Sequence, residues 1–144
     1  MKWVFWIVVS LVGSVGIVAL IGAFLPVGHV ASRTADFNKP PADVFALIAN
    51  PATYRAWWTG ADVKSEVVES APPSRLVTRV IGETQFGGTW TIDILPTSRG
   101  SSMTVTERGE IYNVVFRTLA RYVFGYTGTM DSFLAAAKLK LNEN

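Results

Sequence analysis

The stretch TWTIDILPTSRGSSMTVTERGEI, residues 89–111, holds two runs of alternating side chains on either side of a turn signal. Successive side chains of a strand point to opposite faces, so Trp90, Ile92 and Ile94 are expected on one face of the first run. The segment PTSRG at residues 96–100 is typical of a hairpin turn. The stretch therefore predicts an antiparallel hairpin with one apolar face.

The sequence before this hairpin predicts three more strands and two short helices. The strands are expected over residues 30–37, 62–70 and 75–81. Proline suits the first helical turn, so the helices are expected to begin at Pro41 and Pro51, the second with Asn50 as its N-cap.

The sequence after the hairpin predicts a terminal helix. From Val115 to Ala137, apolar residues recur at spacings of three, four or seven. Gly125 and Gly128 interrupt this pattern and indicate a kink or a place where bulk is excluded. The whole order predicts an α+β domain in which a curved antiparallel sheet wraps around a long C-terminal helix.

The first segment is expected to cross a membrane. Trp3 to Leu25 is a run of 23 residues without a charged side chain, and a helix of about 20 apolar residues spans a bilayer. We therefore expect residues 1–26 to be one transmembrane anchor and residues 27–144 to be the domain. A cleaved signal peptide is the alternative, but its apolar core would be shorter, about 7–15 residues.

The charges that flank this segment bear on its orientation. Lys2 and the amino terminus lie on one side, and Arg33 and Lys39 on the other, so the balance of positive charge is nearly even. The short basic tail favours the amino end inside. We expect a single-pass protein of a bacterial inner membrane, with its domain on the extracytoplasmic side.

Composition excludes several kinds of chemistry. The 13 Lys and Arg against 11 Asp and Glu give a net charge of +2, spread thinly, which argues against a nucleic-acid partner. The chain has no cysteine and one histidine, His29, which we place in the linker after the anchor. Thiolate chemistry and cysteine-ligated metals are excluded, and we expect no metal site and no cofactor.

Five segments resemble one superfamily. They are PPADVFALI at 40–48, YRAW at 54–57, FGGTWT at 86–91, TERGEI at 106–111, and VFR at 115–117 through TMD at 129–131. Over about residues 30–141 the chain is similar to the START-like SRPBCC superfamily of polyketide cyclase/dehydrase and lipid-transport proteins, and to a membrane-anchored bacterial subgroup of it. The resemblance implies a helix-grip fold with a cavity for an apolar ligand between the sheet and the terminal helix.

One region departs from that pattern. Only four residues separate Trp58 from Val63, where members of the superfamily usually have an extra strand or hairpin. Either the sheet is shortened here or the cavity is open on this side.

Large aromatic residues are the candidate ligand contacts, because apolar pockets are lined mainly by such side chains. They are Phe45, Trp57, Trp58, Trp90, Tyr122, Tyr126 and Phe133. The alternative is that these rings fill an ordinary core. The glycines at Gly125 and Gly128 favour the cavity.

Glu107 is the candidate catalytic residue. It has the strand parity of Met103 and Val105, so it is expected to point inward, where a carboxylate can act on a ligand. The alternatives are a bulge at Gly109 that resets the faces, or pairing with an arginine.

Arg117 and Arg121 are spaced to share one helix face. They are candidates for binding an acidic headgroup, or else a solvated face that pairs with residues such as Glu110.

Three functions remain open. The first is a non-enzymatic, membrane-anchored module that binds a lipid-like or polyketide-like molecule. The second is a cyclase or dehydratase that uses Glu107, although one carboxylate is a small acid–base set. The third is a membrane scaffold or interaction protein with a filled core, whose protein partner the sequence does not identify.

Overall fold

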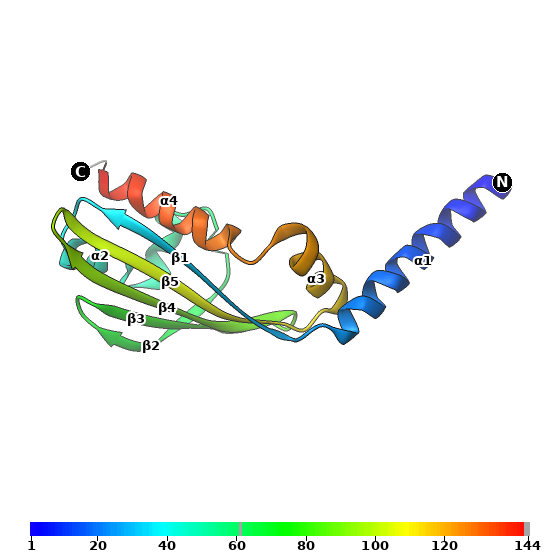
Figure 1. Ribbon diagram of the computed structural model, residues 1–144, viewed down its shortest axis with the longest axis horizontal. Coiled ribbons are helices and arrows are strands. Elements are labelled where there is room, and N and C mark those ends of the chain that lie inside the picture. The colour runs from blue at the N-terminus through cyan, green and yellow to red at the C-terminus, as the bar shows by residue number, and fades with distance from the viewer. Residues whose placement is uncertain (61, 143–144) are drawn as a thin grey trace.

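The computed structural model describes residues 1–60 and 62–142. Helix α1 (Lys2–Phe24) projects from one end of an elongated molecule, and the sheet occupies the other end (Figure 1). Helix α1 is long and apolar enough to cross a membrane, and the part that meets this criterion is not buried inside the protein. The division into an anchor over residues 1–26 and a domain over residues 27–144 stays a prediction.

The described residues form a five-stranded antiparallel sheet with the order β1-β5-β4-β3-β2. The strands are β1 (Gly28–Phe37), β2 (Ser65–Ala71), β3 (Arg75–Val80), β4 (Phe86–Thr97) and β5 (Gly100–Ile111). The predicted hairpin is β4–β5, in which Ile94 faces Met103 and Ile92 faces Val105. Paired residues of antiparallel strands share a face, so the predicted apolar face is confirmed. Strands β1 and β2 form the two edges of this sheet.

Both predicted short helices are present between β1 and β2. Helix α2 (Pro41–Ile48) carries Asp43 in its first turn, where a carboxylate interacts favourably with the helix dipole. The 3-10 helix η1 (Pro51–Ala56) follows, and the side chain of Asn50 accepts a hydrogen bond from the Ala52 N–H at 3.0 Å. This N-cap begins η1 as the sequence predicts.

The terminal helix is broken into parts with different neighbours. Helix α3 (Val114–Leu119) continues into the π-helical turn η2 (Ala120–Phe124), which ends at Gly125 with φ of 72°. Helix α4 (Gly128–Asn142) then runs along the sheet, whereas α3 lies beside α1 and η2 packs on α3 (Figure 1). The interrupting glycines therefore mark a change of partner, and α4 is the part of the described terminal helix that runs along the sheet.

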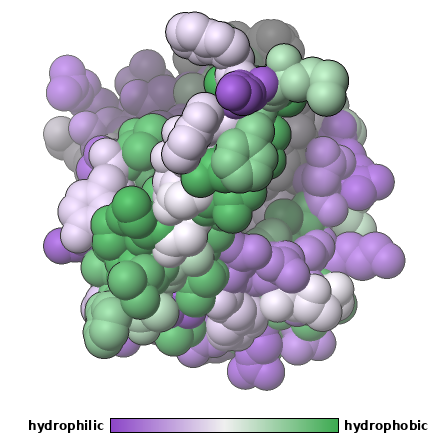
Figure 2. Space-filling view, turned by 90° about the vertical axis from the view of Figure 1, so that its right-hand side faces the viewer, coloured by the Kyte–Doolittle hydropathy of each residue, from purple (hydrophilic) through white to green (hydrophobic). Residues whose placement is uncertain are grey.

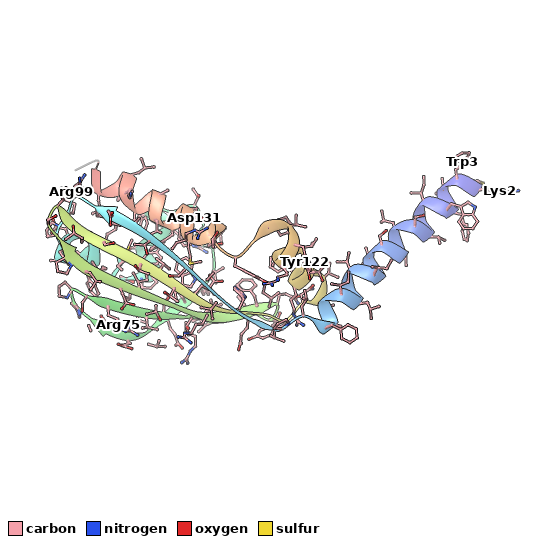
Figure 3. All side chains as sticks on the ribbon, in the orientation of Figure 1. Lys2, Trp3, Arg75, Arg99, Tyr122 and Asp131 are labelled. Atoms are coloured by element: carbon pink, nitrogen blue, oxygen red, sulfur yellow. The ribbon has the colours of Figure 1, made fainter. Side chains whose placement is uncertain are left out.

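The core lies between the concave face of the sheet, α2 and α4. Its fully buried residues are Leu76, Ile92, Ile94, Met103 and Val105 from the sheet, Val44 and Ile48 from α2, and Met130, Phe133 and Ala137 from α4. An ion pair on the surface also joins β1 to α4, because Arg33 Nε donates to Asp131 Oδ1 at 2.9 Å. Asp131 is labelled on α4 in Figure 3. The predicted α+β class is confirmed.

Candidate functional site

Five aromatic side chains pack against one another on the concave face and are called the ring cluster: Tyr54, Trp57, Trp58, Trp90 and Phe133. Phe133 is fully buried at the centre. Its ring centroid lies 5.1 Å from that of Trp58 and 5.4 Å from those of Tyr54, Trp57 and Trp90. Aromatic pairs at these separations attract one another beyond their burial. The cluster joins η1, β4 and α4.

The structure brings most of the predicted ligand contacts together. Trp57, Trp58, Trp90 and Phe133 are in the ring cluster, and Phe45 is buried in the same core. Tyr122 is not brought there. It lies exposed on η2, beside α3 and not on α4, because the helix breaks at Gly125 (Figure 3).

The rings fill the space in which the cavity was expected. Two hollows in the described part of the chain lie elsewhere. One, of about 410 Å³, opens on the convex face of the sheet beside Arg79, Thr89 and Arg108. The other is a groove on the surface of α1. Neither of these lies between the sheet and α4.

A set of hydrogen-bonded polar side chains, called the polar group of the site, borders the ring cluster. Trp90 Nε1 donates a hydrogen bond to Glu107 Oε2 at 2.6 Å, and His29 Nε2 lies 2.9 Å from Glu107 Oε1. The side chains of His29 and Glu107 are 11% and 20% exposed. The carboxylate is thus held by two partners while part of it stays accessible.

Strand register explains this arrangement. Trp90 of β4 directly faces Glu107 of β5, and His29 of β1 faces Gly109. The side chains of Trp90, Glu107 and His29 all lie on the concave face of the sheet, as the strand parity of Glu107 predicts. A Cβ at residue 109 would collide with the His29 ring, so Gly109 leaves room for the imidazole. The register continues through Gly109 without a bulge, and the partner of Glu107 is His29, not an arginine.

Tyr126 completes this polar group from the loop between η2 and α4. Its ring stacks on His29 with centroids 4.0 Å apart and planes 16° apart. Two buried nitrogens, His29 Nδ1 and Trp57 Nε1, have no hydrogen-bond partner among the described residues. Leaving a buried polar atom without a partner costs about 1–3 kcal/mol. A ligand group that formed a hydrogen bond with either nitrogen would recover part of this cost.

Sequence reasoning missed His29 by placing it in the linker after the anchor. Strand β1 begins at Gly28, so His29 is already in the sheet. His29, Ala31 and Ala35 share the parity of buried Phe37, and this alternation was the available signal. The carboxylate that it meets is 78 residues away in sequence.

Tyr54 has a structural role at the end of the ring cluster. Its hydroxyl donates to the Ile48 carbonyl oxygen at 2.8 Å. Burial raises the pKa of this hydroxyl well above its usual value of about 10. The bond ties η1 to the end of α2.

Arg117 is on neither a headgroup-binding nor a solvated face, contrary to both readings of the sequence. It is buried, and its guanidinium donates to the carbonyl oxygens of Ile111 (2.8 Å), Gly22 (2.9 Å), Tyr112 (3.1 Å) and Leu25 (3.2 Å). These acceptors belong to the end of β5, the residue after it and the end of α1. Arg121 is exposed.

No family model and no curated protein sequence matches the chain. Solved structures are similar in fold. A protein of Rhizobium leguminosarum has 16% identity and a TM-score of 0.61, over 81% of this chain and 96% of its own. A START superfamily protein from Mycobacterium smegmatis has 11% identity and a TM-score of 0.61, over 80% of this chain and 98% of its own.

A third similar structure is the di-domain ARO/CYC StfQ from the steffimycin biosynthetic pathway. Its identity is 12% and its TM-score 0.61, over 81% of this chain and 52% of that longer chain. These likenesses establish the fold: the chain has the helix-grip architecture of START-like SRPBCC proteins.

Proposed function

We propose that this protein is a membrane-anchored START-like domain that binds an apolar molecule bearing a polar group on the concave face of its sheet. The observation that carries the proposal is the contact between the ring cluster and the Glu107–His29 pair. Ligand pockets combine an apolar lining with a few placed polar groups, and both parts meet at Trp90.

The chemistry of the site suggests the class of ligand. The rings would contact a lipid-like or polyketide-like body, and Glu107 would accept a hydrogen bond from a hydroxyl at its end. Because the rings fill the interior, binding requires some of them to move. Trp57 and Trp90 are only partly buried and are the candidates for that movement.

We also propose that α1 is retained as an anchor in a bacterial inner membrane, with the domain on the extracytoplasmic side. Its length and composition support a membrane span. The contact with α3 supports retention, because cleavage after Leu25 would remove two carbonyl partners of buried Arg117. An anchor would hold the domain beside a store of apolar ligand.

The test is to purify the full chain from membranes and identify the small molecules it retains by mass spectrometry. We expect one apolar compound at close to one per chain. Glu107→Gln should reduce this amount, whereas Glu110→Gln, on the opposite face of β5, should not. A folded wild-type chain that retains no compound would contradict the proposal and favour a scaffold with a filled core.

A second candidate is an enzyme of the cyclase or dehydratase type. The observation in its favour is the 2.9 Å contact between His29 Nε2 and Glu107 Oε1, which pairs two groups able to transfer protons. The retained compound should then be converted by the wild type. His29→Gln should abolish conversion while binding persists, and unchanged conversion would exclude this role for the pair.

A further inference from the structure

The contact between α1 and α3 is polar inside and apolar outside. Arg117 and Thr118 are each 7% exposed. Phe116, on the same turn, is exposed. This is the reverse of the sheet domain, where apolar side chains are inside.

The inner side of the contact has two features of helix pairs in lipid. Thr118 Oγ1 donates to the Val18 carbonyl oxygen at 2.8 Å, and Arg117 Nη1 donates to those of Gly22 and Leu25. A Cβ at Gly22 would collide with the Val114 carbonyl oxygen, so glycine permits close approach of the two backbones. Small residues and interhelical hydrogen bonds are the means by which helices associate where no hydrophobic force acts between them.

The outer side carries four exposed side chains, called the α3 patch: Phe116, Tyr122, Val123 and Phe124. Phe116 lies on α3, which packs beside α1, and its ring centroid is 6.4 Å from that of Phe124 on η2. In the last turns of α1, Leu20, Ile21 and Phe24 are also exposed. Seen from this end, hydrophobic residues gather in a broad band with hydrophilic ones on either side (Figure 2). The exposed apolar surface at this end of the molecule therefore includes the last turns of α1 and, through Phe116, the α3 patch.

The depth of the contact fits a membrane interface. Its bonds to α1 run from Val18 to Leu25, which at 1.5 Å per residue is about 10 Å along the helix. Interfacial segments bury their apolar face about 5–10 Å into the boundary between headgroups and acyl chains. Exposed Arg121 lies next to Tyr122, and a cation there suits the anionic headgroups of that layer.

We propose that α3 and η2 form a second membrane contact, in which the α3 patch is buried in the lipid bilayer beside the end of α1. This inference rests on the proposed anchoring by α1. This second contact would let the bilayer orient the domain, because Arg117 joins the end of α1 to the end of β5. Tyr126 follows η2 by two residues and stacks on His29, so the polar group of the candidate site is close to the membrane surface.

Single-cysteine labelling tests this contact, because the natural sequence has no cysteine. The full chain with Val123→Cys is labelled with a nitroxide and placed in vesicles of phosphatidylethanolamine and phosphatidylglycerol. The matched control is Leu139→Cys on α4, since Val123 and Leu139 are 66% and 65% exposed. Val12→Cys, at a residue 65% exposed in the middle of α1, reports on the anchor. Collisions with dissolved oxygen and with a water-soluble nickel complex are compared.

We expect the ratio of oxygen to nickel collisions at residue 123 to exceed that at residue 139 several-fold and to approach that at residue 12. A ratio at 123 equal to that at 139, with residue 12 in lipid, would overturn the second contact and leave the anchor intact. Residue 12 in water would overturn the anchor. Spin–spin broadening at 123, with both reagents excluded, would show that a second copy covers the α3 patch and would also overturn the lipid contact.

Discussion

In the sheet half of the molecule, Phe133 and its aromatic neighbours lie inside, whereas in the α1–α3 half, Arg117 and Thr118 lie inside and Phe116 outside. Water makes the first arrangement favourable, since burying apolar area contributes about 25 cal/mol per Å². Lipid supplies no such force and leaves hydrogen bonding and close packing to hold helices together. Under the proposed anchoring, the two halves would thus follow the rules of two different solvents within one chain.

The largest effect that this comparison predicts is in the sheet half. Phe133→Ala removes the centre of the ring cluster and should lower the free energy of unfolding by about 3–5 kcal/mol, from lost burial and the cavity left behind. Denaturant titration of the full chain in detergent measures this. Leu139→Ala, on the exposed side of α4, should change it by less than about 0.5 kcal/mol. Equal effects would contradict a ring-based core.

In the other half, Arg117→Ala should have the next largest effect. It leaves four carbonyl groups without their charged donor, and we expect a loss of about 2–4 kcal/mol. Hydrogen exchange should locate this loss in α3 and the end of α1 and leave β4 and β5 protected. Arg121→Ala, on the exposed side, is the matched control. Loss of protection throughout the sheet would show that the halves unfold as one unit.

A smaller effect is expected from Tyr54→Phe, which removes the bond to Ile48 and should cost about 1 kcal/mol near neutral pH. Burial raises the pKa of Tyr54 in the folded state, so the unfolded chain loses this proton first as the pH rises above about 10. Wild-type stability should therefore fall above that pH, and the variant should lack this part of the fall. The free energies of unfolding of the wild type and of Tyr54→Phe should converge as the pH rises. A constant difference between them would contradict burial as the cause of the raised pKa of Tyr54.

The smallest change in stability is expected for two equally buried threonines, one in each half of the molecule. Thr118→Val removes a hydrogen bond between helices and should cost about 0.6 kcal/mol, the average found for such bonds in membrane proteins. Thr78 is also 7% exposed but lies against the apolar core. Thr78→Val should be neutral or slightly stabilising, because it replaces a buried hydroxyl by a methyl group. Thermal unfolding of both variants in detergent would show the difference, and a reversed order would contradict the comparison.

Local patterns predicted most of the fold. Alternation specified the β4–β5 hairpin and its inward face, including Glu107. Proline and asparagine marked the start of η1. These features depend on neighbours in sequence, whose geometry is set by strand pleating and helix capping.

The candidate site was predicted less completely. Most of its aromatic residues were identified from residue type, because large apolar side chains are usually buried. Tyr122 was included among the predicted ligand contacts because the helical periodicity continues past Gly125. Periodicity shows which residues share a helix face, but it does not show what that face contacts. His29 was missed because its partner Glu107 comes from another strand.

The sequence alone determined an apolar N-terminal helix, an α+β domain and most of the residues that face its core, since each depends on local periodicity and composition. Only the tertiary structure decided that the terminal helix divides its contacts, that His29 meets Glu107, and that Arg117 binds the end of α1. These outcomes depend on the register of distant strands and on the packing of backbones at Gly22, which no spacing along the chain encodes.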